Sequence, residues 1–588
     1  MLNLKYLFNN NQISFVLLAI GIFVFRCLFS SWIIDQFRDD NIFVLRAFYY
    51  PQSKLYNSQE SQPNIVVILI NLERRLFIKS INPECIYEGN RYLASLESVH
   101  EGYSHAPCRL GLFRIVCQLP WRQEPPNNKI GISLRGSPTI KISLKPADSK
   151  FRQLIFCPGR MFLFEQWHLF LATMESNKLL GADLIIAHIQ SIITELIPLL
   201  KIYENEGILQ IRSSLRMPDN QKQNLLFNPN EETLWNNQLI NFHECLYEFK
   251  KGRWGKKDLL NINIKNHFYS DIKHKCFKSS SELLLKIKIK MENFYKKGKG
   301  AGLMRGGAFS LFFIFFFHAG IFKKILSVYF FSGKFLFSAA FIGFPDWDDI
   351  LISPSAIPFT KGLMDFSMAN PQVAAFLPKR YPGQIEILEK LLSRSPTSPI
   401  EHLFLESIKF SIWPEDAEFI SKIILRPQLV NSVDLHGVGQ IIEGFIQSEL
   451  PENIAFFVHA RDFKNARMTA ILPPALLLTR NTLLTLQKHN LSSFSSSPLL
   501  KKLPKKEKYL NLLNNCLKRK NIEGRVRTQK QSKCFNYAQC KPKIKLQIED
   551  EECLNTDNLW EEIYLPNKHL RIFVLEESRL KIKKICQI

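Results

Sequence analysis

An alternation of strand-like and helix-like segments between residues 151 and 211 constrains the fold more than any other feature of the sequence. Short apolar runs typical of buried strands lie at 151–157, 183–188 and 208–211. Between them, the spacing of apolar residues predicts helices at 164–180 and 192–206, the second of them kinked at Pro198. A strand–helix–strand–helix–strand order predicts a parallel sheet with helices packed on it, and therefore an α/β fold.

A cluster of carboxylates follows another apolar run. Residues 341–344 end at Pro345, and Asp346, Asp348 and Asp349 come directly after it. In an extended chain, residues two positions apart point to the same side, so Asp346 and Asp348 are expected to share one side. Open α/β sheets bind ligands at their carboxyl edge, and Mg²⁺ and Mn²⁺ prefer oxygen ligands shared with substrate phosphates. The pattern predicts a metal–diphosphate site, with a solvated turn as the alternative.

The net charge of +24 does not by itself indicate a nucleic-acid-binding protein. Residues 251–337 carry 18 Lys and Arg against 4 Asp and Glu, and residues 501–533 carry 12 against 2. These two stretches account for the whole excess of positive charge. The remainder contains no nucleic-acid motif that we can identify and no basic face interleaved with aromatic residues. Nucleic acid is therefore not expected as a partner.

The amino terminus predicts a membrane anchor. Residues 13–34 form an apolar run, and about 20 such residues can span a hydrocarbon core. Lys5 and the free amine precede the run and mostly acidic residues follow it, so we expect residues 1–12 in the cytosol and the body of the chain in the secretory lumen. No small-residue cleavage pattern follows the run, which favours an uncleaved signal-anchor over a cleaved signal peptide.

The cysteines fit a lumenal protein. There are 12 of them, and their scattered spacing matches no zinc-ligand pattern. Disulfide bonds persist in oxidising compartments and are the expected explanation. The glycosylation sequon at Asn490 is also consistent with a lumenal surface loop.

These features predict how the chain is organised. A cytosolic tail and the anchor precede a stem and β-rich region, in which strand-like runs occur at 65–70, 111–117 and 139–143. The α/β domain follows, interrupted by a Lys- and Phe-rich stretch, and a C-terminal extension ends in a cysteine-containing appendage. The predicted boundaries of these parts are 1–12, 13–34, 35–150, 151–480 with the interruption at 251–337, and 481–588.

Several blocks of sequence, in the same order, resemble glycosyltransferase family 92, a family abundant in nematodes. The blocks before the interruption are 156–160 (Phe-Cys-Pro-Gly-Arg), 165–167, 181–183, 203–207 and 241–245. The blocks after it are 344–349 (Phe-Pro-Asp-Trp-Asp-Asp), 424–427, 433–437 and 450–459. The resemblance covers roughly 85–250 and 338–465, which makes it far more specific than an isolated Asp-x-Asp.

The resemblance implies a GT-A fold, a Rossmann-like α/β domain that binds a nucleotide sugar. It implies an inverting transfer of galactose from UDP-galactose to a glycan acceptor, an N-glycan or a glycolipid. With the predicted anchor, it implies a single-pass type II protein of the Golgi membrane whose catalytic domain is lumenal. The implied cofactor is Mn²⁺ or Mg²⁺, held by Asp346 and Asp348, while Asp349 would bind the metal or sugar hydroxyls. His436, with His459 as the second choice, would complete the metal site.

The catalytic base is less well defined by the sequence. An inverting transfer needs a carboxylate that takes the proton of the acceptor hydroxyl. Asp434, Glu401 and Glu415 are the candidates, and the sequence does not rank them.

The donor is expected to contact the end of the first strand of the α/β domain. The segment from Cys157 to Arg160 precedes the first helix, and the amino terminus of a helix favours phosphate. Glu165 is a further candidate for nucleotide binding in this region.

The stretch 251–337 departs from the family pattern, because related proteins run almost directly from the block at 241–245 to the aspartate motif. Its Lys, Phe, Ile and Asn bias is what a translated AT-rich intron would give, and we hypothesise that it is one, with a true insertion as the alternative. A transcript that contains the stretch would contradict this hypothesis. Two other classes stay open: a catalytically inactive, membrane-tethered protein with the same fold, and a multi-pass membrane protein with a further span at 308–344.

Overall fold

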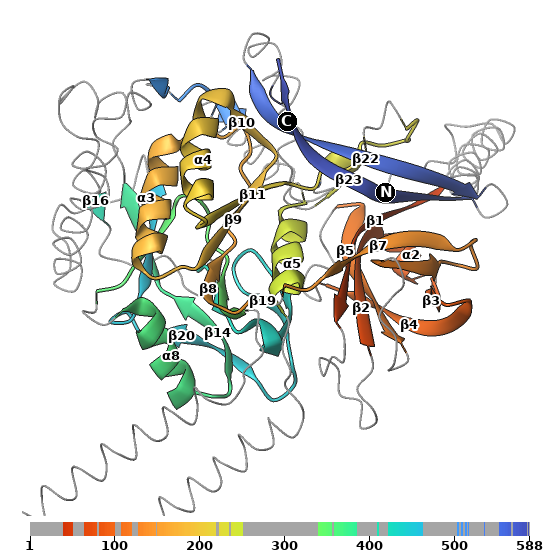
Figure 1. The fold of residues 1–588 in the computed structure, drawn as a ribbon, viewed down its shortest axis with the longest axis horizontal. Coiled ribbons are helices and arrows are strands. Elements are labelled where there is room, and N and C mark those ends of the chain that lie inside the picture. Colours follow the sequence, from red (N-terminus) through yellow and green to blue (C-terminus); the bar gives the residue numbers. More distant parts are fainter. Residues whose placement is uncertain are drawn as a thin grey trace, which may run out of the picture.

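The computed structural model describes an α/β region and a β-rich region that precedes it (Figure 1). The described residues are 39–50, 64–78, 81–99, 108–119, 128–148, 150–218, 223–233, 237–250, 339–354, 358–384, 409–410, 421–461, 502–504, 507–509, 512–513, 515–516, 534, 552–565, 569–584 and 586. The predicted anchor at 13–34 and the stretch at 251–337 lie outside these ranges. Among the described helices, none is long and apolar enough to cross a membrane.

The α/β region is built on a seven-stranded sheet with the order β11-β9-β8-β12-β17-β14-β20. Its parallel core consists of β8 (Arg152–Phe156), β9 (Leu184–Ile189), β11 (Leu209–Ser213) and β12 (Ala339–Gly343). The helices α3 (Trp167–Leu179) and α4 (Ile197–Asn205) connect the first three of these strands. The predicted α/β fold and its order of strands and helices are therefore confirmed.

Helices cover both faces of this sheet. Leu154 and Phe156 of β8 pack with residues of α3 and α4 in one apolar cluster, and Figure 1 shows these two helices side by side. Ile155, which points to the opposite face, packs with residues of α5 (Gln238–Phe249). Because successive side chains of a strand alternate between faces, a sheet covered on both faces requires strands that are apolar at every position. The central strand β9, which is buried at every position, has this character, whereas the outer strand β11 is only partly buried.

Pro198 does not kink a helix. The chain forms the short strand β10 (Ser191–Ile193) and a 3₁₀ turn (Thr194–Leu196) before α4 begins at Ile197. Pro198 therefore lies in the first turn of α4, where its missing N–H costs no hydrogen bond and its fixed φ suits the helix. The predicted helix at 192–206 is too long at its start, and the predicted kink is wrong for this reason.

Beyond β12 the chain divides between the large sheet and a four-stranded sheet. The large sheet is completed by β17 (Ile424–Leu425), β14 (Val373–Pro378) and β20 (Ile446–Leu450). The four-stranded sheet consists, in order, of β13 (Asp349–Ile352), β21 (Phe456–Arg461), β15 (Arg380–Gln384) and β16 (Lys409–Phe410). The remaining elements of this part are the helix α8 (Phe359–Ala369) and the hairpin of β18 (Val430–Val433) and β19 (Val438–Ile441).

The strands of the β-rich region close into a ring. Their order is β1 (Asp40–Tyr50), β2 (Asn64–Glu73), β5 (Leu110–Leu119), β4 (Asn90–Ser98), β3 (Glu84–Tyr87), β6 (Lys129–Ser133) and β7 (Ile140–Pro146), and β7 pairs back with β1. Alternate residues of these strands form an apolar interior. Phe43 and Phe48 of β1 lie on the other face and pack in one cluster with Ile240 and Tyr247 of α5. The strands predicted at 65–70, 111–117 and 139–143 are confirmed.

A long C-terminal hairpin connects the two regions. It consists of β22 (Cys553–Leu565) and β23 (Leu570–Lys583). β23 pairs in parallel with β1 of the ring, and β22 pairs with β10 of the α/β region. The expected disulfides are present among the described cysteines as Cys85–Cys117, Cys108–Cys534, Cys157–Cys245 and Cys553–Cys586. The expected appendage thus contributes strands that pair with both regions.

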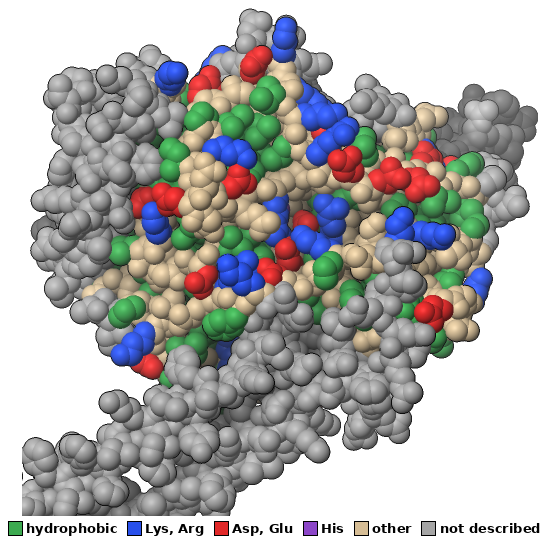
Figure 2. Space-filling view, in the orientation of Figure 1, with side chains coloured by type: hydrophobic (Ala, Val, Ile, Leu, Met, Phe, Trp, Pro, Cys, Tyr) green, Lys and Arg blue, Asp and Glu red, His purple; other side chains and the backbone are tan. Residues whose placement is uncertain are grey.

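Charged side chains of both signs are interspersed over the face of the molecule that Figure 2 shows. Several of the described ones form ion pairs, such as Lys178 with Glu206 at 2.8 Å and Arg571 with Glu562 at 2.7 Å. Ion pairs at or near the surface contribute at most about 1 kcal/mol each to stability, so their main effect is to keep the surface polar.

Candidate functional site

Two loops meet at the carboxyl edge of the parallel sheet. β8 and β12 are neighbours in parallel register, so the residues that follow them emerge at the same edge. The N–H of Cys157 donates to the carbonyl of Gly343, and the N–H of Gly159 donates to the carbonyl of Pro345, both at 2.8 Å. The loop after β8 is therefore fixed against the start of the aspartate motif, at the edge where the sequence predicts carboxylates.

The aspartate motif forms a turn. The N–H of Asp349 donates to the carbonyl of Asp346 at 3.1 Å, and the N–H of Asp346 donates to Oδ2 of Asp349 at 3.0 Å. The extended geometry expected for residues 346–348 is wrong, because the strand ends at Gly343 and these reciprocal bonds stabilise a turn instead. As a result, the three carboxylates have different partners.

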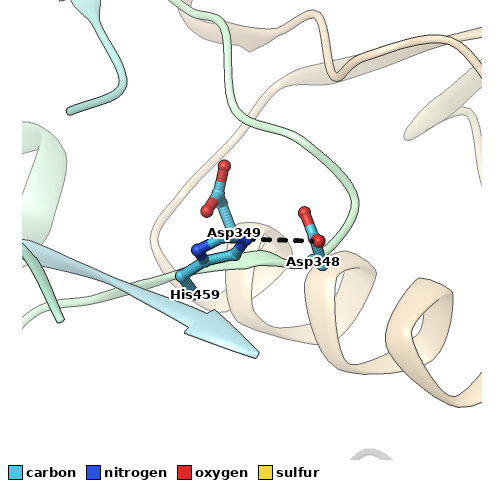
Figure 3. A group of neighbouring side chains, drawn as sticks. All are labelled: Asp348, Asp349 and His459. Atoms are coloured by element: carbon cyan, nitrogen blue, oxygen red, sulfur yellow. Dashed lines mark ion pairs between the residues drawn. The ribbon is translucent and has the colours of Figure 1, made fainter. Parts of the chain in front are cut away.

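Asp348, Asp349 and His459 form a group that could hold a metal ion (Figure 3). Each offers one ligand atom, and these atoms all lie within 4.8 Å of one another. Antiparallel pairing of β13 with β21 places Asp349 directly opposite His459, and Nε2 of His459 lies 3.4 Å from Oδ2 of Asp348. Carboxylate oxygens suit Mn²⁺ and Mg²⁺, and an imidazole nitrogen is the commonest further ligand in protein metal sites.

Arg380 of β15 forms a buried ion pair with Asp349. Its Nη2 and Nε lie 2.6 and 2.8 Å from Oδ1 of Asp349. Both residues are almost completely buried, with exposed fractions of 2% and 1%. Two N–H groups directed at one carboxylate oxygen fix its orientation, because the pair would be costly to separate in this environment.

Lys422 forms a second ion pair, with Asp346. Its Nζ lies 2.7 Å from Oδ2 of Asp346, and Nε2 of Gln238 donates to Oδ1 at 3.1 Å. Lys422 is buried and also donates to the carbonyl of Leu435 at 3.3 Å, whereas Asp346 is partly exposed. Burial would raise the pKa of Asp346, but the Lys422 ammonium outweighs this effect and lowers the pKa below its ordinary value. Asp346 is therefore ionised at neutral pH.

Helix α3 packs against the aspartate turn. Trp347 is buried between Phe164 and Phe170. The centroid of its ring lies 6.1 Å from that of Phe164 and 5.3 Å from that of Phe170. The hydroxyl of Thr173 donates to the carbonyl of Trp347 at 2.8 Å, and the hydroxyl of Ser176 donates to the carbonyl of Leu351 in β13. Trp347 lies between Asp346 and Asp348 in the sequence. Burial of its large aromatic ring thus fixes the position of the aspartate turn relative to helix α3.

The two candidate histidines lie in different places. His459, the second choice from the sequence, belongs to the group with Asp348 and Asp349. Nδ1 of His436 lies 3.3 Å from the carbonyl of Ser421. Burial and the nearby Lys422 ammonium lower the pKa of His436 to about 4, so this side chain is neutral at neutral pH. The structure thus groups Asp348 and Asp349 with His459, whereas His436 lies near Asp346 and Lys422.

The candidate bases are only partly covered by the structure. Asp434 lies in the turn between β18 and β19, where its N–H donates to the carbonyl of Gly437 and its Oδ1 accepts from the N–H of Leu435. Leu435 also accepts from Lys422, so this turn is connected to the site through that lysine. Glu401 and Glu415 lie outside the described residues.

The predicted nucleotide-binding residues have partners within the protein. Arg160 is buried, and its guanidinium lies over the ring of Phe162 at 5.6 Å. Glu165 is also buried, and its carboxylate accepts from the N–H groups of Lys508 and Tyr509. Helix α3 begins only at Trp167, so its amino terminus is separated from the loop after β8. The helix predicted at 164–180 therefore begins three residues later than expected.

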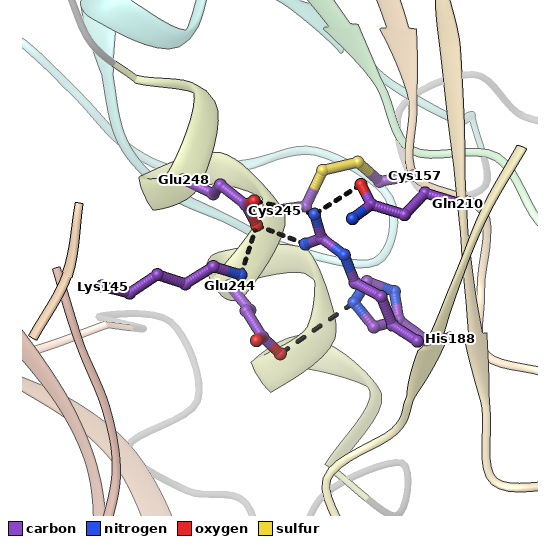
Figure 4. The surroundings of a disulfide bond; sticks show 8 residues. Lys145, Cys157, His188, Gln210, Glu244, Cys245 and Glu248 are labelled. Atoms are coloured by element: carbon purple, nitrogen blue, oxygen red, sulfur yellow. Dashed lines mark hydrogen bonds and ion pairs between the residues drawn. A yellow bond between two sulfur atoms is a disulfide. The ribbon is translucent and has the colours of Figure 1, made fainter. Parts of the chain in front are cut away.

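Cys157 is bonded to Cys245 of α5, and Figure 4 shows this disulfide beside a group of charged residues. The disulfide connects the start of the loop after β8 to α5. Close to it, Glu244 of α5 pairs with Arg46 of β1 at 3.2 Å, and Glu248 pairs with Lys145 of β7 at 2.9 Å. These pairs fix α5, and with it Gln238, between the β-rich region and the sheet.

His188 of β9 lies within this charged group, with Nε2 4.0 Å from Glu244. Complete burial lowers the pKa of His188 to about 3, so the residue is neutral at neutral pH and the contact is not an ion pair. Burial would raise the pKa of Glu244, but the charges of Arg46 and Lys145 lower it to about 2.

Sequence reasoning missed Arg380, Lys422 and Gln238. Lys422 directly precedes the apolar residues 423–425, and Arg380 follows the end of a buried strand. A cation next to a buried strand is a signal that it has an anionic partner, because Lys and Arg are rarely buried without one. That signal does not identify the partner, which depends on the arrangement of strands.

Comparisons with known proteins agree with the resemblance seen in the sequence. A family model described as glycosyltransferase family 92 matches residues 152–255 and 334–507. The chain is similar to glycosyltransferase family 92 protein F59C6.8 of Caenorhabditis elegans, with 27% identity over 217 residues, or 36% of this chain and 40% of that protein. Proteins F13G3.3 and F55C10.4 of the same family and organism are 23% and 24% identical over 36% and 40% of this chain, and 40% and 46% of their own lengths. The match spans less than half the length of these relatives.

Substitution of Gly159 by Ala tests the close approach of the two loops. A β-carbon at this position would lie 2.5 Å from Oδ1 of Asp346 and 2.7 Å from Nε2 of Gln238, so we expect Gly159→Ala to lower the free energy of unfolding by about 1–3 kcal/mol. In the control, Gly362→Ala in α8, the nearest atom is 3.5 Å away, and the higher helix propensity of Ala should stabilise the protein by up to about 1 kcal/mol. Urea unfolding measures both, and equal stability of the two variants would contradict the described contact.

The neutral state of His188 predicts a dependence of stability on pH. Between pH 6.5 and about 3, the unfolded chain binds a proton at His188 that the folded protein does not. Stability should therefore fall as pH falls below 6.5, by up to about 1.4 kcal/mol per pH unit. His188→Asn should remove this contribution, so its unfolding free energy should vary less between pH 6.5 and 5 than that of the wild type. Parallel pH profiles of the two proteins would show that folding does not depress this pKa.

Proposed function

The chain belongs to glycosyltransferase family 92, and we propose that it transfers a hexose, galactose from UDP-galactose, to a glycan acceptor with inversion at the anomeric carbon. The acceptor class that we propose is an N-glycan or a glycolipid, and the proposed fold of the catalytic domain is GT-A. The observation that supports this most strongly is the group of Asp348, Asp349 and His459 at the carboxyl edge of a parallel sheet. Both features suit a nucleotide sugar, because ligands of open α/β sheets bind at this edge and a divalent ion can share its coordination with a diphosphate.

The residues present fit a divalent ion. Two carboxylates and one imidazole, with ligand atoms within 4.8 Å of one another, could be bridged by a single Mn²⁺ or Mg²⁺. When bound, such an ion would stabilise the negative charge that develops on the departing diphosphate. Arg380 keeps Asp349 oriented for this role, and the packing of Trp347 on α3 fixes the turn that carries Asp348.

The protein's own part in the reaction is to position the donor and to accept a proton. The acceptor hydroxyl oxygen would attack the anomeric carbon while the bond to the diphosphate oxygen breaks, and the hydroxyl proton would pass to a carboxylate. Asp434 is the candidate base within the described residues, because its turn is connected to the site through Leu435 and Lys422. Asp346, held by Lys422 and Gln238, would accept hydrogen bonds from donor hydroxyls.

One observation favours an active enzyme over the alternative of a catalytically inactive relative. A stretch inserted directly before the aspartate motif could displace the strand that carries it. β12 nevertheless pairs with β8 on one side and β17 on the other, and the aspartate turn is formed. Anchoring in the Golgi membrane, with the catalytic domain in the lumen, is part of the same proposal and is supported by the apolar run at 13–34 and by the disulfides among the described residues.

Thermal melting with donor and metal tests the proposal. With UDP-galactose and Mn²⁺ at about 100 times the dissociation constant, binding should add about 2.7 kcal/mol to the stability of the folded protein. Asp348→Ala should abolish this gain, whereas Asp365→Ala, which removes an exposed carboxylate from α8, should retain it. A folded wild-type protein that shows no metal-dependent shift with UDP-galactose would contradict the proposal.

A further inference from the structure

The candidate metal site contains two cations of its own. Lys422 pairs with Asp346 at 2.7 Å, and Arg380 pairs with Asp349 at 2.6 Å. Both cationic residues are buried, with exposed fractions of 1% and 2%. The three carboxylates of the turn therefore share their environment with two fixed positive charges, and these five side chains together carry a formal charge of −1.

A divalent ion that enters this site alone meets opposing forces. Asp348 attracts it, but the charges of Asp346 and Asp349 are already largely compensated by their partners, and Lys422 and Arg380 repel it. Buried charges interact through a low effective dielectric constant and are poorly screened by salt, so this repulsion is substantial. A diphosphate brings at least two further negative charges, which compensate the added charge of the ion beside Lys422 and Arg380.

We infer that Lys422 and Arg380 make metal binding depend on the nucleotide diphosphate, so that the ion and the donor bind together and the donor-free protein has only a weak affinity for the ion. This inference rests on the proposed function of the site. Lys422 is the stronger determinant of the two, because its partner Asp346 is partly exposed and would become a further ligand if it were released.

The coupling between metal binding and diphosphate binding must act in both directions. If UDP increases the affinity for Mn²⁺ by a given factor, Mn²⁺ increases the affinity for UDP by the same factor. The benefit to a transferase is selectivity, because a site of this kind holds the ion mainly when a diphosphate is present. Lys422 and Arg380 are therefore positioning residues, since they act on the aspartates rather than on the reacting atoms.

Titration of Mn²⁺ into the purified full chain, followed by calorimetry, tests the inference without any measurement of activity. In the wild type, saturating UDP should increase the affinity for Mn²⁺ by about ten-fold or more, the usual range for coupled binding. Lys422→Met removes one repelling charge and releases Asp346. The donor-free variant should bind Mn²⁺ about ten-fold more tightly than the donor-free wild type, and the factor gained from UDP should shrink.

Two further variants serve as controls. Lys422→Arg keeps the positive charge and should bind Mn²⁺ as the wild type does. Lys379→Met removes a lysine from the neighbouring, half-exposed pair with Glu452, and should leave both the affinity and the UDP factor unchanged. If Lys422→Met does not fold, as judged by circular dichroism, Lys422→Gln replaces it, and the wild-type titrations with and without UDP remain a test.

The outcomes separate this inference from the proposed function. A folded Lys422→Met variant with unchanged or weaker Mn²⁺ affinity would overturn the inference, as would a wild type that binds Mn²⁺ equally well with and without UDP while UDP itself binds. Failure of UDP to bind under any condition would instead contradict the proposed function. In that case, the donor-free titrations of the wild type and Lys422→Met still decide whether Lys422 suppresses metal binding.

Discussion

The pairing of β12 with β8 is the constraint on which the site depends. Phe341, Ile342 and Gly343 lie opposite Leu154, Ile155 and Phe156 in parallel register, so the two strands end together. Gly343 allows this closeness, because a β-carbon there would lie 2.6 Å from the ring of Phe156. This register brings the loop after β8 and the aspartate turn after β12 together, and the hydrogen bond from Gly159 to Pro345 fixes them against each other. Everything that the site can do follows from their being at one edge of the sheet.

The second determinant is the compensation of buried charge. Asp349 is almost completely buried, and removal of one partner from such an ion pair typically costs about 3–5 kcal/mol. Arg380, which comes from β15, is therefore as necessary to the turn as the aspartates themselves. The same holds for α5, which supplies Gln238 to Asp346 and is fixed to the β-rich region by the pairs of Glu244 and Glu248. The electrostatics of the site thus connect it to the β-rich region as well as to the sheet.

The sheet and the position of the aspartates could be predicted from the sequence, because both leave local signals. The runs that became β9 and β12 are apolar at nearly every position, as doubly covered strands must be, and Pro345 marks the end of β12. The partners of the aspartates could not be predicted, because Arg380 and His459 lie in strands, and Lys422 precedes a strand, whose order in the sheets has no local signal. The choice of His436 before His459 shows this, since only the register of β13 and β21 places His459 opposite Asp349.

The central claim is that Asp348, Asp349 and His459 hold a divalent ion which a nucleotide diphosphate helps to bind. A crystal of the protein grown with Mn²⁺ and UDP, measured at the manganese absorption edge, would test it most directly. We expect an anomalous peak bonded to Asp348, Asp349 and His459, with the diphosphate completing the coordination. A peak at His436, or a UDP bound away from the aspartate turn, would contradict it.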